Sequence, residues 1–239
     1  MTANLKPIVI ESLIDGEQLV TNLEEIEATV ARLTPAKIRC VFSTTSCFAP
    51  RTPDKVIDIA KICKTQDIFH VVNNAYGLQC GKITNDLNQA HKQGRLDVLI
   101  SSTDKNFMVP VGGSLIYAPV KKHLIEKINK FYPGRASASP LMDLFLTFLQ
   151  MGEVNLKRLM AERKQNFAYL KEQLTIVAEK HGERVLAVNG NKISMACSLS
   201  NLNETVFKPN NINATYFGSY LFSRRVSGVR VVNTSNGKL

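Results

Sequence analysis

The chain has 239 residues, of which 44% are hydrophobic and 21% are charged, proportions that indicate a folded globular protein and exclude a disordered one. Its 30 Lys and Arg residues against 20 Asp and Glu residues give a net charge of +10, which favours a nucleic acid partner, although a solvated positive surface is an equally good explanation. The sequence has no apolar run of about 18 residues and no basic-then-apolar leader, so we expect a cytoplasmic protein without a membrane partner.

The cysteines are spread along the chain, and none belongs to a CxxC motif. The five are Cys40, Cys47, Cys63, Cys80 and Cys197. An odd number without paired spacing argues against a disulfide framework and against a zinc site. We therefore expect reduced cysteines that serve mostly as packing residues, and no metal.

The first part of the chain alternates apolar runs of strand length with segments of helical periodicity. Strands are expected at 8–10, 38–43, 70–74, 96–101 and 114–117, and helices at 22–33, 53–64 and 85–93. Asn22 is the expected N-cap of the first helix, with a Glu three residues later. This alternation predicts βαβ crossovers, and therefore an α/β fold with a mostly parallel sheet that helices cover on both faces.

The second part of the chain is expected to be helical at first and then mixed. We expect a basic helix at 120–132, a buried apolar helix at 141–151 and a long amphipathic helix at about 153–181 that connects two domains. Strands at 185–188, 193–197 and 229–232 and a helix at 214–224 then predict a smaller C-terminal α/β unit, and the Asn-rich stretch 201–213 predicts a mobile surface loop.

Polar clusters follow three of the expected parallel strands. They comprise residues 43–46, 73–77 and 103–105. Because ligands of such sheets bind beyond the C-terminal ends of the strands, we expect the three clusters to converge on one crevice.

Lys105 is the residue in these clusters with the clearest chemistry. It follows a buried strand and precedes a Pro and two Gly residues that turn the backbone. Burial there would disfavour the ammonium form and leave a nucleophilic amine that can bind a carbonyl cofactor covalently. The alternative is a lysine that extends from the strand end to solvent, and the segment by itself favours that alternative.

A pyridoxal phosphate enzyme needs an amine for the cofactor, a partner for the pyridine nitrogen and donors for the phosphate. Lys105 supplies the amine, and Asn73 is placed to face the ring nitrogen, although a turn residue that satisfies its own backbone explains Asn73 equally well. Ser43 and Ser46 are candidate hydroxyl donors to the cofactor, with capping of a turn as the alternative. Arg135 is a candidate phosphate ligand, and a solvated loop arginine is its alternative.

Five longer stretches extend the pattern over nearly the whole chain. They are residues 43–51 (STTSCFAPR), 72–77 (VNNAYG), 104–113 (DKNFMVPVGG), 132–140 (YPGRASASP) and 225–232 (RVSGVRVV). In this order they resemble the O-phosphoseryl-tRNA(Sec) selenium transferase family, also called selenocysteinyl-tRNA synthase or soluble liver antigen. The resemblance implies a fold type I pyridoxal phosphate transferase, a homotetramer in the cytoplasm, that makes selenocysteinyl-tRNA(Sec) from O-phosphoseryl-tRNA(Sec) and selenophosphate in selenocysteine biosynthesis.

The resemblance also implies roles for individual residues. Lys105 would bind pyridoxal 5'-phosphate covalently, Asn73 would face its pyridine nitrogen, and Arg135 would lie beside the substrate. Lys92 stands where the family has an arginine that contacts the tRNA, so the charge is kept but the guanidinium is not. Arg224 matches a second tRNA-contacting arginine. The expected partner is therefore the acceptor arm of tRNA(Sec) and not DNA.

The family has an N-terminal part with a phosphate-binding loop and a C-terminal continuation that find no counterpart here, so we expect a central fragment. Residues 1–151 would be part of the large cofactor-binding domain, and residues 152–239 the linker helix and part of the small C-terminal domain. Two alternative functions stay open. One is a catalytically inactive, truncated tRNA-binding or assembly module, and the other is a pyridoxal phosphate lyase for a free amino acid, such as a cysteine desulfurase using Cys197.

Overall fold

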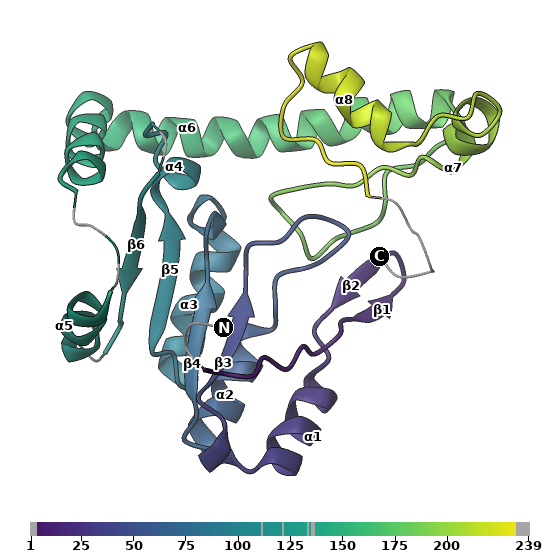
Figure 1. Ribbon diagram of the computed structural model, residues 1–239. Coiled ribbons are helices and arrows are strands. Elements are labelled where there is room, and N and C mark those ends of the chain that lie inside the picture. Colours follow the sequence, from purple (N-terminus) through teal and green to yellow (C-terminus); the bar gives the residue numbers. More distant parts are fainter. Residues whose placement is uncertain (1–3, 111, 121, 133, 135–136, 233–239) are drawn as a thin grey trace. The chain divides into compact units, whose positions relative to one another are not determined.

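The structure is a computed structural model that describes residues 4–110, 112–120, 122–132, 134 and 137–232 (Figure 1). Backbone contacts divide the chain into two compact units. The first unit contains the residues up to Phe167 together with Ala187–Met195, and the second contains Ala168–Leu186 and the residues from Ala196 onward. The long helix α6 (Ser139–Lys180) belongs to both units, and the predicted domain boundary after residue 151 stays a prediction.

A four-stranded sheet with the order β3-β4-β5-β6 forms the centre of the first unit (Figure 1). Its strands are β3 (Cys40–Thr44), β4 (Phe69–Asn73), β5 (Val98–Ser102) and β6 (Ser114–Tyr117). The first three are parallel, and β6 runs antiparallel to β5. The predicted α/β fold with a mostly parallel sheet is therefore confirmed.

Two crossover helices cover one face of this sheet. They are α2 (Val56–Thr65) and α3 (Gly81–Gln93), which follow β3 and β4 in the chain. Their apolar stripes meet Val72 and Leu99 of the strands in a buried core. Side chains alternate along a strand, so Phe42 of β3 points to the opposite face, where it is 61% exposed. The prediction that helices cover both faces is wrong at this strand within the described residues.

The N-terminal segment forms a hairpin and a capped helix. The elements are β1 (Leu13–Asp15), β2 (Gln18–Val20), α1 (Leu23–Leu33) and the 3₁₀ turn η1 (Pro35–Lys37). The Asn22 side chain accepts a hydrogen bond from Glu25 N at 3.0 Å, which confirms the predicted cap. The strand predicted at 8–10 is wrong, because pairing starts only at Leu13, which lies opposite Val20. The two-residue loop Gly16–Glu17 has a glycine with φ 61° at its first position, which favours a tight hairpin turn.

The helix predicted at 141–151 exists as the first part of α6, but its burial is wrong. Leu141, Phe145 and Leu149 are exposed, the last at 67%, whereas Leu144 is buried. An apolar helix is buried only where another layer covers it, and the described residues supply little such cover. At Gly152 the backbone leaves the helical region, with φ 66° and ψ 169°, so α6 consists of two helices joined at a bend. The basic helix predicted at 120–132 is present as α5 (Lys122–Phe131), which precedes α6 in the chain.

The second unit is mostly helical. After α6 it contains α7 (Ser200–Leu202), the π-helical turn η3 (Asn203–Phe207) and α8 (Thr215–Ser223). The predicted strands at 185–188 and 193–197 are reduced to one bridge, Val185 to Cys197, and none is present at 229–232. The predicted loop at 201–213 is partly helical, because Glu183 accepts hydrogen bonds from Ser200 N at 3.1 Å and Leu202 N at 2.9 Å and so caps α7.

Burial raises the pKa of Glu183, but the hydrogen bonds from Ser198, Leu202 and Ser200 outweigh this effect and hold the pKa of the carboxyl below its usual value.

The helix predicted at 214–224 is confirmed as α8. The centre of its Phe217 ring lies 6.2 Å from the centre of the Phe207 ring.

Within the part of the chain that the structure describes, no helix combines the length and the apolar composition needed to cross a bilayer.

Candidate functional site

The C-terminal ends of β3, β4 and β5 bring the three predicted polar clusters together. Thr45 N donates to Asn73 O at 3.0 Å, and Tyr76 N donates to Ser46 Oγ at 2.9 Å, which joins the first two clusters. Ser102 N, at the end of β5 and directly before the third cluster, donates to Ala75 O of the second cluster at 3.0 Å. The predicted convergence of the clusters at one edge of the sheet is therefore confirmed, and the crevice between them stays a prediction.

The buried side-chain amide of Asn74 links the ends of these strands by hydrogen bonds. Asn74 is fully buried, and its Oδ1 accepts from Thr45 Oγ1 at 2.6 Å, while its Nδ2 donates to Ser101 Oγ at 3.3 Å. The close approach requires a glycine at position 77, because a Cβ there would lie 1.8 Å from Asn74 Oδ1. Sequence reasoning missed Asn74, although an Asn at the end of an apolar strand is a signal for a buried hydrogen-bond network.

Lys105 lies in the single helical turn α4 (Thr103–Asn106), which directly follows β5. Its carbonyl oxygen accepts a hydrogen bond from Gln79 Nε2 at 2.7 Å. Its side chain is 50% exposed, and Nζ lies 3.3 Å from Ser102 Oγ and 3.6 Å from the Asp104 carboxylate. Of the two explanations left open, burial of the Lys105 amine is wrong for the described chain, and the exposed side chain that the segment by itself favoured is present, here on a fixed backbone.

The neighbours of Lys105 in α4 are also tied to the strand ends. Thr103 Oγ1 donates to Gly113 O at 3.0 Å, and Asn106 Nδ2 donates to Ala75 O at 2.7 Å. The hydrogen bond from Ser102 and the charge of Lys105 hold the pKa of Asp104 below its usual value, so this carboxylate stays negatively charged beside the amine.

Asn73 is the last residue of β4 and is partly buried. Its Oδ1 accepts from Ala75 N at 3.0 Å, so the turn role that was the alternative explanation is present. That bond uses the accepting end of the amide. The donating Nδ2 end is therefore the part that Asn73 can present to a ligand, and a pyridine nitrogen with a free lone pair is a suitable acceptor.

The two candidate serines have different surroundings. Ser46 accepts the hydrogen bond from Tyr76 N described above, at the strand-end edge. Ser43 is buried on the helix-covered face, where its Oγ lies 2.8 Å from His70 Nε2. A bond from Ser43 to a cofactor stays a prediction, and the Ser43–His70 pair counts against it.

Burial lowers the pKa of His70 to about 4, although the hydrogen bond to the Arg95 carbonyl and the charge of Asp97 act to raise this pKa.

The remaining predicted residues are not brought into this cluster by the described structure. Lys92 is exposed in the last turn of α3 in the first unit. Arg224 follows α8 in the second unit, where its guanidinium carbon lies 3.4 Å from the centre of the Tyr220 ring. Arg135 lies outside the described residues.

The residues present fit pyridoxal phosphate at two of its groups. An accessible amine on a fixed backbone suits the aldehyde, and the Nδ2 amide of Asn73 suits the ring nitrogen. Among the residues that the structure describes, no group of three or more His, Cys, Asp or Glu side chains is arranged to hold a metal ion.

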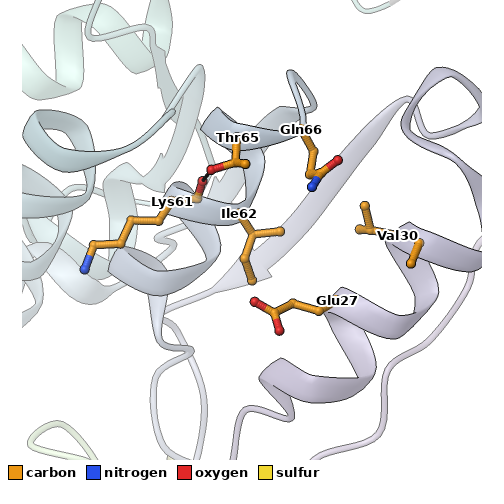
Figure 2. Close-up of a pocket in the computed structure, with 7 residues that line it drawn as sticks. Glu27, Val30, Lys61, Ile62, Thr65 and Gln66 are labelled. Atoms are coloured by element: carbon orange, nitrogen blue, oxygen red, sulfur yellow. Dashed lines mark hydrogen bonds between the residues drawn. The ribbon is translucent and has the colours of Figure 1, made fainter.

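A groove of about 420 Å³ lies elsewhere in the first unit, between α1 and α2 (Figure 2). Figure 2 shows Glu27 of α1 and Ile62 of α2 pointing toward one another across it. Thr65 and Gln66 also line it and lead directly into the start of β4, so the groove lies at the N-terminal end of the strands. It is therefore separate from the Lys105 site.

Comparisons with known proteins decide the family. The family model described as "O-phosphoseryl-tRNA(Sec) selenium transferase, SepSecS" matches residues 1–239. The chain belongs to the O-phosphoseryl-tRNA(Sec) selenium transferase family. The transferase of Dictyostelium discoideum is 48% identical over 247 residues, which cover 100% of this chain and 51% of that relative. The chain thus spans about half the length of the curated relatives it matches.

Solved structures agree with the selenium transferase family and its fold. A crystal structure of an archaeal O-phosphoseryl-tRNA(Sec) selenium transferase has a TM-score of 0.85 and 31% identity, covering 98% of this chain and 51% of that chain. Rice TDC, crystallised with pyridoxal phosphate and tryptamine, has a TM-score of 0.55 and 15% identity over 70% of this chain and 35% of that one, a likeness of fold alone. The fold is therefore fold type I, as the resemblance implied.

Proposed function

We propose that this chain carries the cofactor lysine and part of the active site for the pyridoxal phosphate-dependent conversion of O-phosphoseryl-tRNA(Sec) to selenocysteinyl-tRNA(Sec), with selenophosphate as the selenium donor. The observation that carries the proposal is Lys105, an accessible amine whose backbone is fixed at the C-terminal end of β5. Membership of the selenium transferase family supports it.

Each residue of the cluster then has a defined task. Lys105 Nζ binds the cofactor aldehyde and, when released, moves the proton at the substrate Cα. When bound, the cofactor supplies the electron sink for loss of phosphate from the β-carbon and addition of selenium. Asn73 Nδ2 donates to the ring nitrogen without protonating it, which limits the sink and favours replacement at the β-carbon. Ser46 is a candidate donor to the cofactor.

The substrate and the assembly complete the proposal. Arg135 would bind beside the phosphoseryl group, and Lys92 and Arg224 would contact backbone phosphates in the acceptor arm of tRNA(Sec). We also propose the cytoplasmic homotetramer of the family and a division into residues 1–151, part of the cofactor-binding domain, and residues 152–239, the linker helix and part of the small domain. The net charge of +10 supports the tRNA contacts.

The alternatives have less support. A cysteine desulfurase needs a reactive thiolate, whereas burial and the nearby Glu183 raise the pKa of the Cys197 thiol. A catalytically inactive tRNA-binding module needs no accessible amine at the strand ends.

The test is cofactor binding by the chain and its variants. After addition of pyridoxal phosphate and removal of the unbound cofactor we expect a visible absorbance band in the wild type and its loss in Lys105→Ala, because only cofactor held by the protein's amine then remains to absorb. The matched control is Lys82→Ala, a lysine paired with Asp86 on α3, which should keep the band. A colourless wild type, or a band that survives Lys105→Ala, would contradict the proposal.

A further inference from the structure

Two side chains connect helix α6 to the backbone of Lys105. Arg163 Nε donates to Gln79 Oε1 at 3.1 Å, and Gln79 Nε2 donates to Lys105 O at 2.7 Å. The same guanidinium is held at its other side, because Arg163 Nη2 donates to Lys192 O at 3.0 Å. All four residues belong to the first unit.

We propose that Gln79 and Arg163 are positioning residues that orient the Lys105 backbone for the cofactor reaction. The inference rests on the proposed role of Lys105. It assigns a task to Gln79 and Arg163, which touch neither the expected cofactor nor the reacting atoms and act only through the Lys105 carbonyl.

The chemistry of the three groups fixes their order. A guanidinium only donates hydrogen bonds, and a carbonyl oxygen only accepts them. The amide of Gln79 has one end of each kind, so Oε1 must face Arg163 and Nε2 must face Lys105. A glutamate at position 79 would still pair with Arg163 but would turn an oxygen toward the Lys105 carbonyl.

The need for such support follows from the length of α4. Its four residues, Thr103–Asn106, make only one turn, and a single turn has little intrinsic stability. The last carbonyls of a helix have no partner within it. Gln79 supplies a partner for the Lys105 carbonyl, and the bonds of Thr103 and Asn106 described above hold the two ends of the turn. Loss of Gln79 therefore frees the middle of the turn, where the amine is attached.

The test combines two measurements on the full chain. The first is the fraction of Lys105 that carries cofactor after incubation with pyridoxal phosphate and reduction by borohydride, read by mass spectrometry. The second is hydrogen exchange of the Phe107 amide, which donates to Thr103 O at 3.0 Å and so reports on α4 without any cofactor.

We expect Gln79→Glu to lower the trapped fraction at Lys105, and to speed exchange of the Phe107 amide, by roughly two- to tenfold each, the factor that corresponds to one hydrogen bond. Arg163→Ala should act in the same direction through the released amide, and Arg163→Lys should restore only part of the loss, because a lysine has the charge without the fork.

Two controls separate this effect from a general loss of stability. Gln93→Glu alters an exposed glutamine that pairs with Gln89, and Arg158→Ala alters an arginine that pairs with Glu162 on the same helix as Arg163. Both should leave trapping at Lys105 and exchange of the Phe107 amide unchanged.

Wild-type exchange of the Phe107 amide in folded Gln79→Glu and Arg163→Ala would overturn the inference, whatever the cofactor does. If either variant fails to fold, exchange of the Phe107 amide is measured in Arg163→Lys instead. Exchange faster than in the wild type supports the inference, and exchange at the wild-type rate overturns it. Trapping at another lysine in the wild type would instead overturn the proposed function, so the two failures are distinguishable.

Discussion

At the residue scale, the carbonyl and the amine of Lys105 have opposite surroundings. The carbonyl is bonded to Gln79, whereas half of the side chain is exposed. An amine that must bind a cofactor and then release it needs such an arrangement, because the backbone determines where the amine can reach and the free side chain lets it move. The hydrogen bond to Gln79 at the strand end fixes the backbone of Lys105. The exposure of its side chain in the short turn α4 leaves the amine free to move.

His70 provides a pH prediction at the same scale. Its Nδ1 lies 3.1 Å from the Arg95 carbonyl, so Nδ1 carries the hydrogen and Nε2 accepts from Ser43. Burial lowers the folded-state pKa to about 4, from about 6.5 in the unfolded chain. Between these values only the unfolded chain takes up the proton, so the free energy of unfolding falls by about 1.4 kcal/mol per pH unit as the pH decreases.

Urea unfolding from pH 7.5 to pH 4.5, roughly the window of this histidine, measures the slope directly. His70→Gln should lose stability at every pH but flatten the slope, and His123→Gln, an exposed histidine on α5, should keep it. An unchanged slope in His70→Gln would show that this histidine does not remain neutral in the fold.

Single residues were predictable from the sequence where their partners are local. The Asn22 cap and the Asn73 turn each involve a partner within three residues, and both follow from residue type alone. Gln79 and Arg163 are 84 residues apart, and nothing in either segment indicates their bond. For Lys105 the segment by itself favoured the exposed side chain that is found, whereas the hydrogen bond that fixes its carbonyl comes from Gln79, 26 residues away, and was not predictable.

At the element scale, the bend in α6 depends on Gly152, whose φ of 66° and ψ of 169° lie in a region that is essentially restricted to glycine. We expect Gly152→Ala to lower the free energy of unfolding by about 1–3 kcal/mol, the cost of such a backbone conformation. Gly81→Ala is the control, because a Cβ at the start of α3 meets no atom within 4 Å. Unchanged or higher stability of Gly152→Ala in urea unfolding would mean that the two parts of α6 can form one straight helix.

Strands and helices were predictable in the first unit and less so in the second. Periodicity of the βαβ segments reflects burial within the unit, so β3, β4, β5, α2 and α3 were expected within a few residues of their bounds. The apolar run 141–151 predicted a helix correctly but its burial incorrectly, because composition does not say whether a covering layer exists. The region 201–213 was predicted as a loop because the carboxylate that caps its first turn, Glu183, lies far from it in sequence.

At the scale of the whole molecule, the positive charge and the two candidate tRNA contacts predict binding that depends on salt. Affinity for tRNA(Sec) should fall steeply as salt increases, and Lys92→Ala and Arg224→Ala should each reduce the slope of log affinity against log salt by about 1, since each removes one phosphate contact. Lys157→Ala, an exposed lysine paired with Glu153, should keep the slope. Binding that is indifferent to salt would contradict a phosphate-contacting surface.

The central claim about the molecule is that one lysine anchors the cofactor, and mapping of the trapped cofactor tests it most directly. The wild-type chain is incubated with pyridoxal phosphate, reduced with borohydride, digested and analysed by mass spectrometry. We predict one dominant adduct, on Lys105, and none on the same peptide of Lys105→Ala. An adduct spread over the exposed lysines, or concentrated on a different one, would contradict the claim.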